Sequence, residues 1–277
     1  MELRRSALEA FCTADPQTKL DLVHQLWEMV TNAPNSIPLH AAAPLAQDIA
    51  PGRPALPTLV DPKDVPRRSP FTSEGHAALM HSIAHIEFNA INLALDAVWR
   101  FDRMPDAFYL DWLRVAHEEA KHFGLLRDHL QYLGYVYGDF VAHDGLWTIC
   151  ESTRHDIAAR MALVPRTLEA RGLDATPMIQ ARLKKVGTAN AQAACAILDV
   201  ILREEVGHVA IGNHWYRWLC ERDRLDPRSH YLQVAGEHRA PRLKPPFNLD
   251  ARRRAGFTES ELEALPSIGD AAPTDAV

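Results

Sequence analysis

The chain carries one short pattern twice: a glutamate followed three residues later by a histidine, each time inside a long amphipathic segment. The two copies are Glu119-Ala-Lys-His122 and Glu205-Val-Gly-His208. Side chains three residues apart lie on the same face of an α-helix, about one turn apart, so each glutamate and its histidine can bind the same metal ion. The repeat therefore predicts two helices that contribute equivalent ligand pairs to a carboxylate-bridged two-metal site inside a four-helix bundle.

A further glutamate precedes each copy of the pattern. Glu87 has apolar residues three and four positions away on both sides, so its carboxylate projects from the apolar face of its helix. A carboxylate in that position is costly unless it is paired or bound to a metal ion. Glu169 has the corresponding position before the second copy, although its own apolar stripe is poorer and Glu151 competes with it.

Apolar periodicity predicts an all-α protein without strands. The expected helices are 16–32, 73–102 with Ser73 as N-cap, 105–133, a helix from Leu146 that is interrupted at Pro165 and around Gly172–Pro177, a continuation over 177–186, and 188–222. Glu87 lies about 17 residues before the turn near Met104 and Glu119 about 15 after it, so an antiparallel hairpin places both at one height. Glu169 and Glu205 flank Gly187 equally, provided that 177–186 extends the preceding helix.

The predicted ligand set is rich in oxygen. It comprises Glu87, Glu119, His122, Glu169, Glu205 and His208. Four carboxylates and two imidazoles favour two iron ions, or manganese or a mixed iron–manganese pair, over zinc, which prefers closed tetrahedral nitrogen and sulfur sites. Glu118 and Glu204 lie four residues before the two histidines and are rivals; Glu118 shares a solvated face, and Glu204 is harder to exclude.

A second line of polar residues runs along the first long helix, away from Glu87. Its members are His81, His85, Asn89, Asn92 and Asp96. We interpret this line as a solvated or inter-element face in preference to a second binding site.

Two segments lack helical periodicity. Residues 34–70 are rich in proline but also carry many apolar side chains, which favours an extended arm packed on the domain over a disordered linker. After Asp223 the chain is expected to be irregular, with the basic residues of 239–254 in solvent. The predicted domains are 1–71, with the N-terminal helix and arm, 72–222, the bundle, and 223–277, the C-terminal extension.

Composition excludes several classes of function. The net charge of -6 gives no general attraction to nucleic acid or to an anionic membrane. Four widely spaced cysteines (Cys12, Cys150, Cys195, Cys220) favour free thiols in a reducing compartment over a disulfide framework. The absence of a signal-like or membrane-spanning stretch leads us to expect a cytoplasmic protein.

Four stretches of the chain carry a resemblance to a known family. They are His-Ser-Ile-Ala-His-Ile-Glu-Phe-Asn-Ala-Ile (81–91), His-Glu-Glu-Ala-Lys-His-Phe (117–123), Met-Ala-Leu-Val-Pro-Arg-Thr-Leu-Glu-Ala-Arg-Gly-Leu-Asp (161–174) and Arg-Glu-Glu-Val-Gly-His-Val-Ala-Ile-Gly (203–212). The chain resembles the ferritin-like proteins of the DUF455 family, which are similar in turn to the MiaE-type di-iron monooxygenases that hydroxylate tRNA. In that type the third-helix ligand lies in an Ile-Glu-Ala-Arg context, which Leu168-Glu169-Ala170-Arg171 matches, so the resemblance favours Glu169 over Glu151. It implies a ferritin-like bundle with a di-metal centre.

Three functions are compatible with these residues. The leading hypothesis is a di-iron oxidoreductase, an oxygen-activating hydroxylase or monooxygenase with an unidentified organic substrate. It would need an external electron donor because the chain has no flavin or nicotinamide fingerprint. The alternatives are a ferroxidase or metal-handling protein without an organic substrate, and a bundle that binds a partner without redox chemistry. Transfer RNA as a partner rests on analogy alone.

Overall fold

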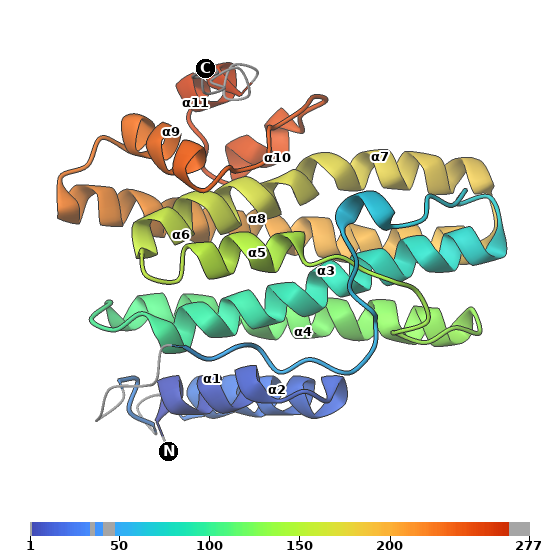
Figure 1. Cartoon of the computed structure of the whole chain (residues 1–277), viewed down its shortest axis with the longest axis horizontal. Helices are drawn as coiled ribbons and strands as arrows, with labels where there is room; N and C mark the ends of the chain where they lie inside the picture. Colours follow the sequence, from blue (N-terminus) through green and yellow to red (C-terminus); the bar gives the residue numbers. More distant parts are fainter. Residues whose placement is uncertain (1, 34–36, 41–47, 266–277) are drawn as a thin grey trace. The chain divides into compact units, whose positions relative to one another are not determined.

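Helices form the regular secondary structure of this protein in the ranges that the structure, a computed structural model, describes: residues 2–33, 37–40 and 48–265 (Figure 1). This confirms the predicted all-α class. The chain divides into two units, one made of residues 1–145 and 186–197 and the other of residues 146–185 and 198–277. Within the described ranges, no helix combines the length and apolar character required to cross a bilayer.

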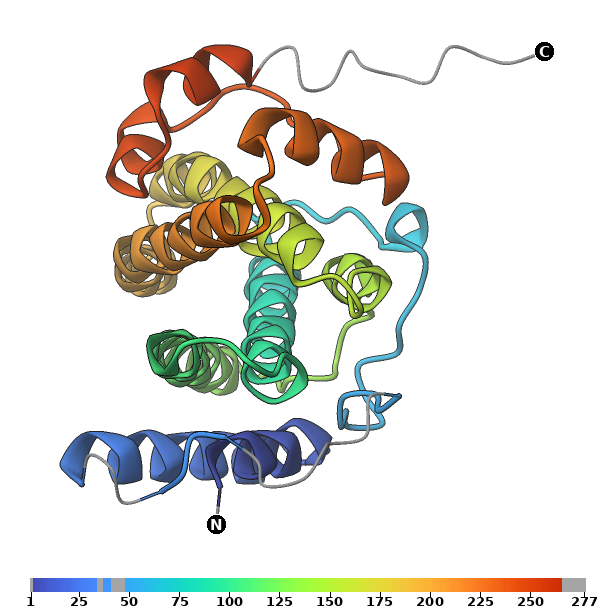
Figure 2. The ribbon, with the colours of Figure 1, turned by 90° about the vertical axis from the view of Figure 1, so that its left-hand side faces the viewer.

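The first unit is built around an antiparallel pair of long helices. Its helices are α1 (Leu3–Cys12), α2 (Pro16–Asn32), the short 3-10 helix η1 (Pro62–Asp64), α3 (Ser73–Arg100), α4 (Asp106–Tyr132) and the start of α8 (Ala189–Asp223). Helices α3 and α4 lie side by side, with α1 against α3 and α2 against α4 (Figures 1 and 2). Thr72, one residue before the predicted N-cap, caps α3, since its hydroxyl accepts from the backbone N–H of Gly75 at 3.1 Å.

An extended segment over residues 48–61 contacts both α1 and the loop that follows α4. The N–H of Gly52 donates to the carbonyl of Phe11 at 2.8 Å. The N–H of Val60 donates to the carbonyl of Ala142 at 2.8 Å, and the Ala142 N–H donates to the carbonyl of Thr58 at 3.0 Å. A Cβ at Gly52 would lie 2.2 Å from the carbonyl oxygen of Cys12, so only glycine permits this approach. The rest of the predicted proline-rich arm falls partly outside the described residues, at 34–36 and 41–47.

The polar line on α3 is buried, and the expectation of a solvated face was wrong for it. His81, His85, Asn89, Asn92 and Asp96 are all at most 6% exposed. Each meets a polar partner from its own unit: for example, His81 Nε2 accepts from the Gly138 N–H at 2.9 Å. The line is therefore an inter-element face, the second of the two alternatives that the sequence left open.

Lys19 on α2 is fully buried against this line. Its ammonium group donates to the carbonyl of Phe11 at 2.9 Å and to the side-chain oxygen of Asn92. Both acceptors are neutral, and burial lowers the pKa of Lys19 to about 7.

This burial predicts a pH-dependent stability. Because the folded pKa of Lys19 lies below its unfolded value, the unfolded chain binds more protons between about pH 7 and pH 10.5, and the stability rises with pH in that window. We expect the denaturation midpoint to rise less steeply from pH 7 to pH 9.5 in the Lys19→Met variant than in the wild type. Equal slopes in the two proteins would contradict the assignment.

The second unit differs from the predicted helix pattern at its start. It contains α5 (Gly145–Ser152), α6 (Ile157–Leu163), η2 (Val164–Glu169), α7 (Ala170–Val186) and most of α8. The predicted interruption around Gly172–Pro177 is absent, because α7 continues through both residues without a break, and the chain instead bends between Ser152 and Ile157. The predicted irregularity at Pro165 takes the form of a π-helix, η2, in which Pro165 has no N–H to donate.

The C-terminal extension is helical and not irregular as predicted. It contains α9 (Pro227–Glu237), α10 (Leu249–Arg254) and α11 (Glu259–Ala264). Apolar residues of α10 and α11 share a buried cluster with Leu173 of α7 and Val209 of α8. The expectation of a solvated basic tail was wrong for Arg252, which is fully buried and forms an ion pair of 2.6 Å with Asp174.

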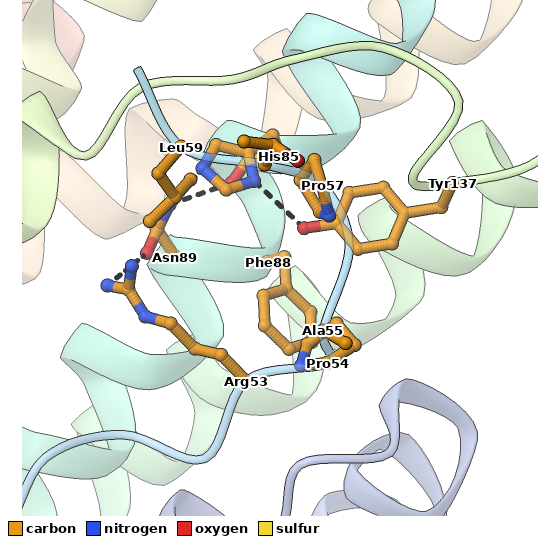
Figure 3. A pocket seen from close by; sticks show the side chains of 10 residues that line it. Arg53, Pro54, Ala55, Pro57, Leu59, His85, Phe88, Asn89 and Tyr137 are labelled. Carbon is orange, nitrogen blue, oxygen red and sulfur yellow. Dashed lines mark hydrogen bonds between the residues drawn. The ribbon is translucent and has the colours of Figure 1, made fainter. Parts of the chain in front are cut away.

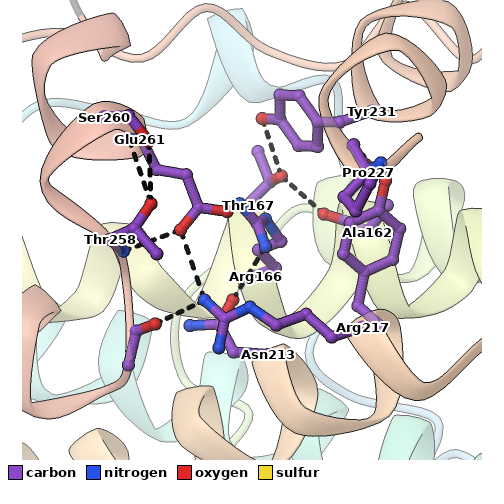
Figure 4. A network of polar contacts seen from close by, with 12 residues as sticks. Ala162, Arg166, Thr167, Asn213, Arg217, Pro227, Tyr231, Thr258, Ser260 and Glu261 are labelled. Carbon is purple, nitrogen blue, oxygen red and sulfur yellow. Dashed lines mark hydrogen bonds and ion pairs between the residues drawn. The ribbon is translucent and has the colours of Figure 1, made fainter. Parts of the chain in front are cut away.

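A polar network ties this extension to η2 and α8 (Figure 4). The guanidinium of Arg166 on η2 contacts Asn213 Oδ1 at 3.2 Å and also donates to Glu261 of α11. Thr167, the next residue, lies 3.0 Å from the hydroxyl of Tyr231 on α9. Side chains of α8, α9 and α11 therefore all contact the π-helix within the second unit.

Candidate metal centre

Three of the six predicted ligands converge in the first unit. Glu87 lies on α3, and Glu119 and His122 lie on α4. His122 Nδ1 is 3.4 Å from Glu87 Oε2 and 3.3 Å from Glu119 Oε2, and the ligand atoms of all three lie within 4.8 Å of one another. The antiparallel hairpin thus brings Glu87 and Glu119 to the same height, as the residue spacing predicted.

Burial makes this cluster electrostatically costly. Glu119 and His122 are fully buried, and Glu87 is 4% exposed. Burial raises the pKa of Glu87 well above its ordinary value, and the neighbouring carboxylate of Glu119 raises it further, whereas the nearby imidazole of His122 opposes the change. Buried, adjacent carboxylates whose pKa values are shifted in this way are common in functional sites.

The remaining predicted ligands lie in the second unit. Glu205 and His208 are both buried on α8, and His208 Nδ1 lies 3.8 Å from Glu205 Oε1. Glu169, the last residue of η2, is also buried, at 8% exposure. Its competitor Glu151 lies on α5 with a side chain that is 58% exposed, which favours Glu169 as the ligand.

The two rival glutamates have other partners. Glu118 Oε1 accepts from the guanidinium of Arg114 at 2.9 Å, and the Arg114 side chain is 54% exposed. Glu204 lies 3.5 Å from Arg203, and its side chain is 17% exposed, whereas that of Glu205 is 11% exposed. The geometry therefore favours Glu119 and Glu205 as the members of the repeated pattern that face inward.

The donor set of the first unit suits a divalent cation. A buried group of two carboxylates and one imidazole can hold a metal ion. Glu87 Oε2 has no hydrogen bond of normal geometry although it is buried, and a bound cation would satisfy it. The imidazole nitrogen nearest to both carboxylates, His122 Nδ1, is the atom that would complete the set. These residues therefore fit a metal ion.

An aromatic cluster beside these ligands was not predicted to belong to a site. Phe88 follows Glu87 and Phe123 follows His122, and their rings lie 5.4 Å apart between centroids. The ring of Tyr137, from the loop after α4, lies 5.0 Å from Phe123 and 5.7 Å from Phe88. Phe123 is fully buried on α4. No sequence signal pointed to Tyr137, because its loop has no periodicity.

Comparison with known proteins supports one assignment. A family model described as a protein of unknown function, DUF455, matches residues 12–263. A relative from Haemophilus influenzae (strain ATCC 51907 / DSM 11121 / KW20 / Rd), described as an uncharacterized protein, is 50% identical over 267 residues, which cover 94% of this chain and 92% of the relative. No solved structure gives a significant match. With a family match over most of its length and a relative of this identity, the chain belongs to the DUF455 family.

Proposed function

We propose that this protein is an oxygen-dependent oxidoreductase with a di-metal centre, most simply two iron ions, inside a ferritin-like four-helix bundle. The single observation that supports it best is the buried convergence of Glu87, Glu119 and His122 in the first unit. The second unit carries the same pattern, Glu169 followed by the Glu205 and His208 pair, with all three residues buried.

The roles follow from charge and position. Glu119 and Glu205 would bridge the two ions, because each belongs to the repeated pattern and faces inward. His122 and His208 would be terminal neutral ligands, and Glu87 and Glu169 terminal carboxylates. Four carboxylates would offset the charge of two divalent cations, which removes the repulsion that Glu87 and Glu119 experience in the protein alone.

A pair of iron ions would supply the redox chemistry that protein side chains lack, namely the reaction with dioxygen. The chain itself contributes the ligands and a dry apolar surrounding, with Phe88 and Phe123 next to the ligands of the first unit. The organic substrate and the external electron donor are separate molecules. Transfer RNA as the substrate has only the analogy in its favour, and the net charge of -6 opposes it.

Metal stoichiometry tests the proposal directly. We expect about two iron or manganese ions per chain, by elemental analysis, in protein purified from its native host or reconstituted anaerobically with Fe(II). The His122→Ala and His208→Ala variants are each expected to retain about one ion or fewer, because each lacks one terminal ligand. The matched control is His214→Ala, since His214 is exposed on the same helix as His208. A wild-type protein that binds zinc alone, or no metal, would overturn the proposal.

The reaction with oxygen separates an oxidoreductase from a metal-handling protein. The reduced, iron-loaded protein should consume about one dioxygen per centre and then require a reductant for further turnover. Continued oxygen uptake with excess Fe(II), accompanied by ferric mineral, would instead assign the protein to iron storage.

A further inference from the structure

A cavity of about 320 Å³ lies between α3 and the extended segment in the first unit (Figure 3). The apolar part of its lining includes Pro54 and Pro57 from the extended segment and the ring of Phe88 from α3. This volume and this mixture of apolar walls with a few polar groups are typical of small-molecule sites. The cavity lies within the first unit, and its described lining does not include Glu87, Glu119 or His122.

Four side chains form a continuous hydrogen-bonded chain at the polar edge of the cavity: Arg53, Asn89, His85 and Tyr137. The donor at one end fixes which atoms donate and accept along the chain. Arg53 donates to Asn89 Oδ1 at 3.2 Å, which fixes the orientation of the Asn89 amide. The Asn89 NH2 group then faces His85, 3.0 Å from Nε2 and 3.1 Å from the backbone carbonyl. Because an amide NH2 group can only donate, His85 Nε2 must be an acceptor, and the imidazole carries its proton on Nδ1.

This tautomer leaves a hydrogen-bond donor for the cavity. His85 Nδ1 lies 2.8 Å from the hydroxyl oxygen of Tyr137, so its N–H donates to that oxygen. The proton of the Tyr137 hydroxyl is therefore not used by His85. The cavity is lined by this hydroxyl on one side and by the guanidinium of Arg53 on the other (Figure 3). Both groups offer hydrogen to an acceptor, and His85 and Asn89 are more than nine-tenths buried behind them.

The charge of the lining selects for an anion. Among the described residues that line the cavity, Arg53 is the one with a formal charge, and none of them is acidic. Asp144, outside the lining, lies 2.7 Å from Arg53 Nη2 with a side chain that is 30% exposed. This contact shows that the guanidinium can receive a carboxylate in its present conformation, and that Asp144 would compete with a second one.

We propose that this cavity binds a small planar carboxylic acid, aromatic or unsaturated, whose carboxylate accepts hydrogen bonds from Arg53 and Tyr137 while its apolar body packs between Phe88 and the two prolines.

Binding of three matched probes to the full chain, kept metal-free with a chelator, tests this proposal. Ligand-observed NMR and calorimetry with benzoate, benzamide and benzylammonium compare one ring with an anionic, a neutral and a cationic group. We expect benzoate to bind more tightly than benzamide, and benzylammonium least. Tyr137→Phe, which removes only the hydroxyl, should weaken benzoate binding about tenfold, because a hydrogen bond to a charged group is lost.

A second variant is expected to strengthen benzoate binding. Asp144→Asn removes the competitor for Arg53 and should tighten benzoate binding severalfold, which a damaged fold would not do. Asparagine also caps a helix well, so the start of α5 is preserved. The matched control is Tyr132→Phe. Tyr132 is the last residue of α4, is 77% exposed and does not line the cavity. Benzoate binding no tighter than benzylammonium binding, or equal effects of the two tyrosine variants, would overturn the proposal.

Discussion

Without metal, the Glu87→Gln variant is expected to be more stable than the wild type at pH 8, by on the order of 1–3 kcal/mol. The raised pKa of Glu87 means that the folded protein holds a proton that the unfolded chain releases above about pH 4.5. The stability of the metal-free wild type therefore falls as the pH rises from 4.5 towards the folded pKa. Glutamine has no such cost, and its amide can donate to the carboxylate of Glu119.

With metal, the order of the two proteins is expected to reverse. Saturation at about a thousand times the dissociation constant adds about 4.1 kcal/mol to a protein that binds the ion only when folded, which exceeds the expected difference between the metal-free proteins. Thermal unfolding midpoints with and without Mn(II), a probe that is stable in air, measure both effects. Mn(II) should raise the unfolding midpoint of the wild type, and it should raise that of Glu87→Gln much less. Glu74→Gln is the control, because Glu74 lies on the same helix with a side chain that is 60% exposed. A destabilised metal-free Glu87→Gln protein would show that Glu87 has a structural role instead.

The Asp174→Asn variant is expected to lose about 3–5 kcal/mol of stability in the second unit. Asp174 receives two hydrogen bonds from Arg252, from Nε at 3.0 Å and from Nη2 at 2.6 Å, and the Asn248 N–H donates to it at 2.8 Å. Arg252 is fully buried, so removal of the negative partner leaves a cation without compensation inside the protein. Chemical denaturation followed by circular dichroism measures the change.

The neighbouring arginine provides the control for this prediction. Arg253 pairs with Glu259 at 2.7 Å, but the two side chains are 44% and 65% exposed. An exposed pair contributes little, so Glu259→Gln should cost less than about 1 kcal/mol. Similar losses in the two variants would mean that the buried ion pair does not hold α10 to α7.

The long helices could be predicted from the sequence because their periodicity extends over many turns. The predicted 105–133 became Asp106–Tyr132, and the predicted 188–222 became Ala189–Asp223. Short helices were missed because helices of six to eleven residues depend on tertiary packing. A local signal was present for α11, where Thr258 and Glu261 form a capping box, but no apolar period accompanied it.

The candidate site divides in the same way. Glu87, Glu119 and His122 could be predicted to meet because they lie on two consecutive helices joined by a short turn, so that counting residues gives their relative height. The cavity beside them could not be predicted. Arg53 comes from an extended segment and Tyr137 from a loop, and neither has a repeating geometry that fixes its distance from Asn89 on α3.

The π-helix at η2 has a consequence for how this sequence can change over time. A π-turn contains one residue more than an α-turn, so the loss of a single residue between Val164 and Glu169 would let the helix close in the ordinary way. The helix on either side would keep nearly its present rotation, because the wide turn accommodates the extra residue, but the side chains within the turn would be redistributed around the helix axis. Glu169 and Arg166 could not both keep their present directions. We therefore expect natural length variation in relatives to avoid these six positions and to accumulate in the connections between helices.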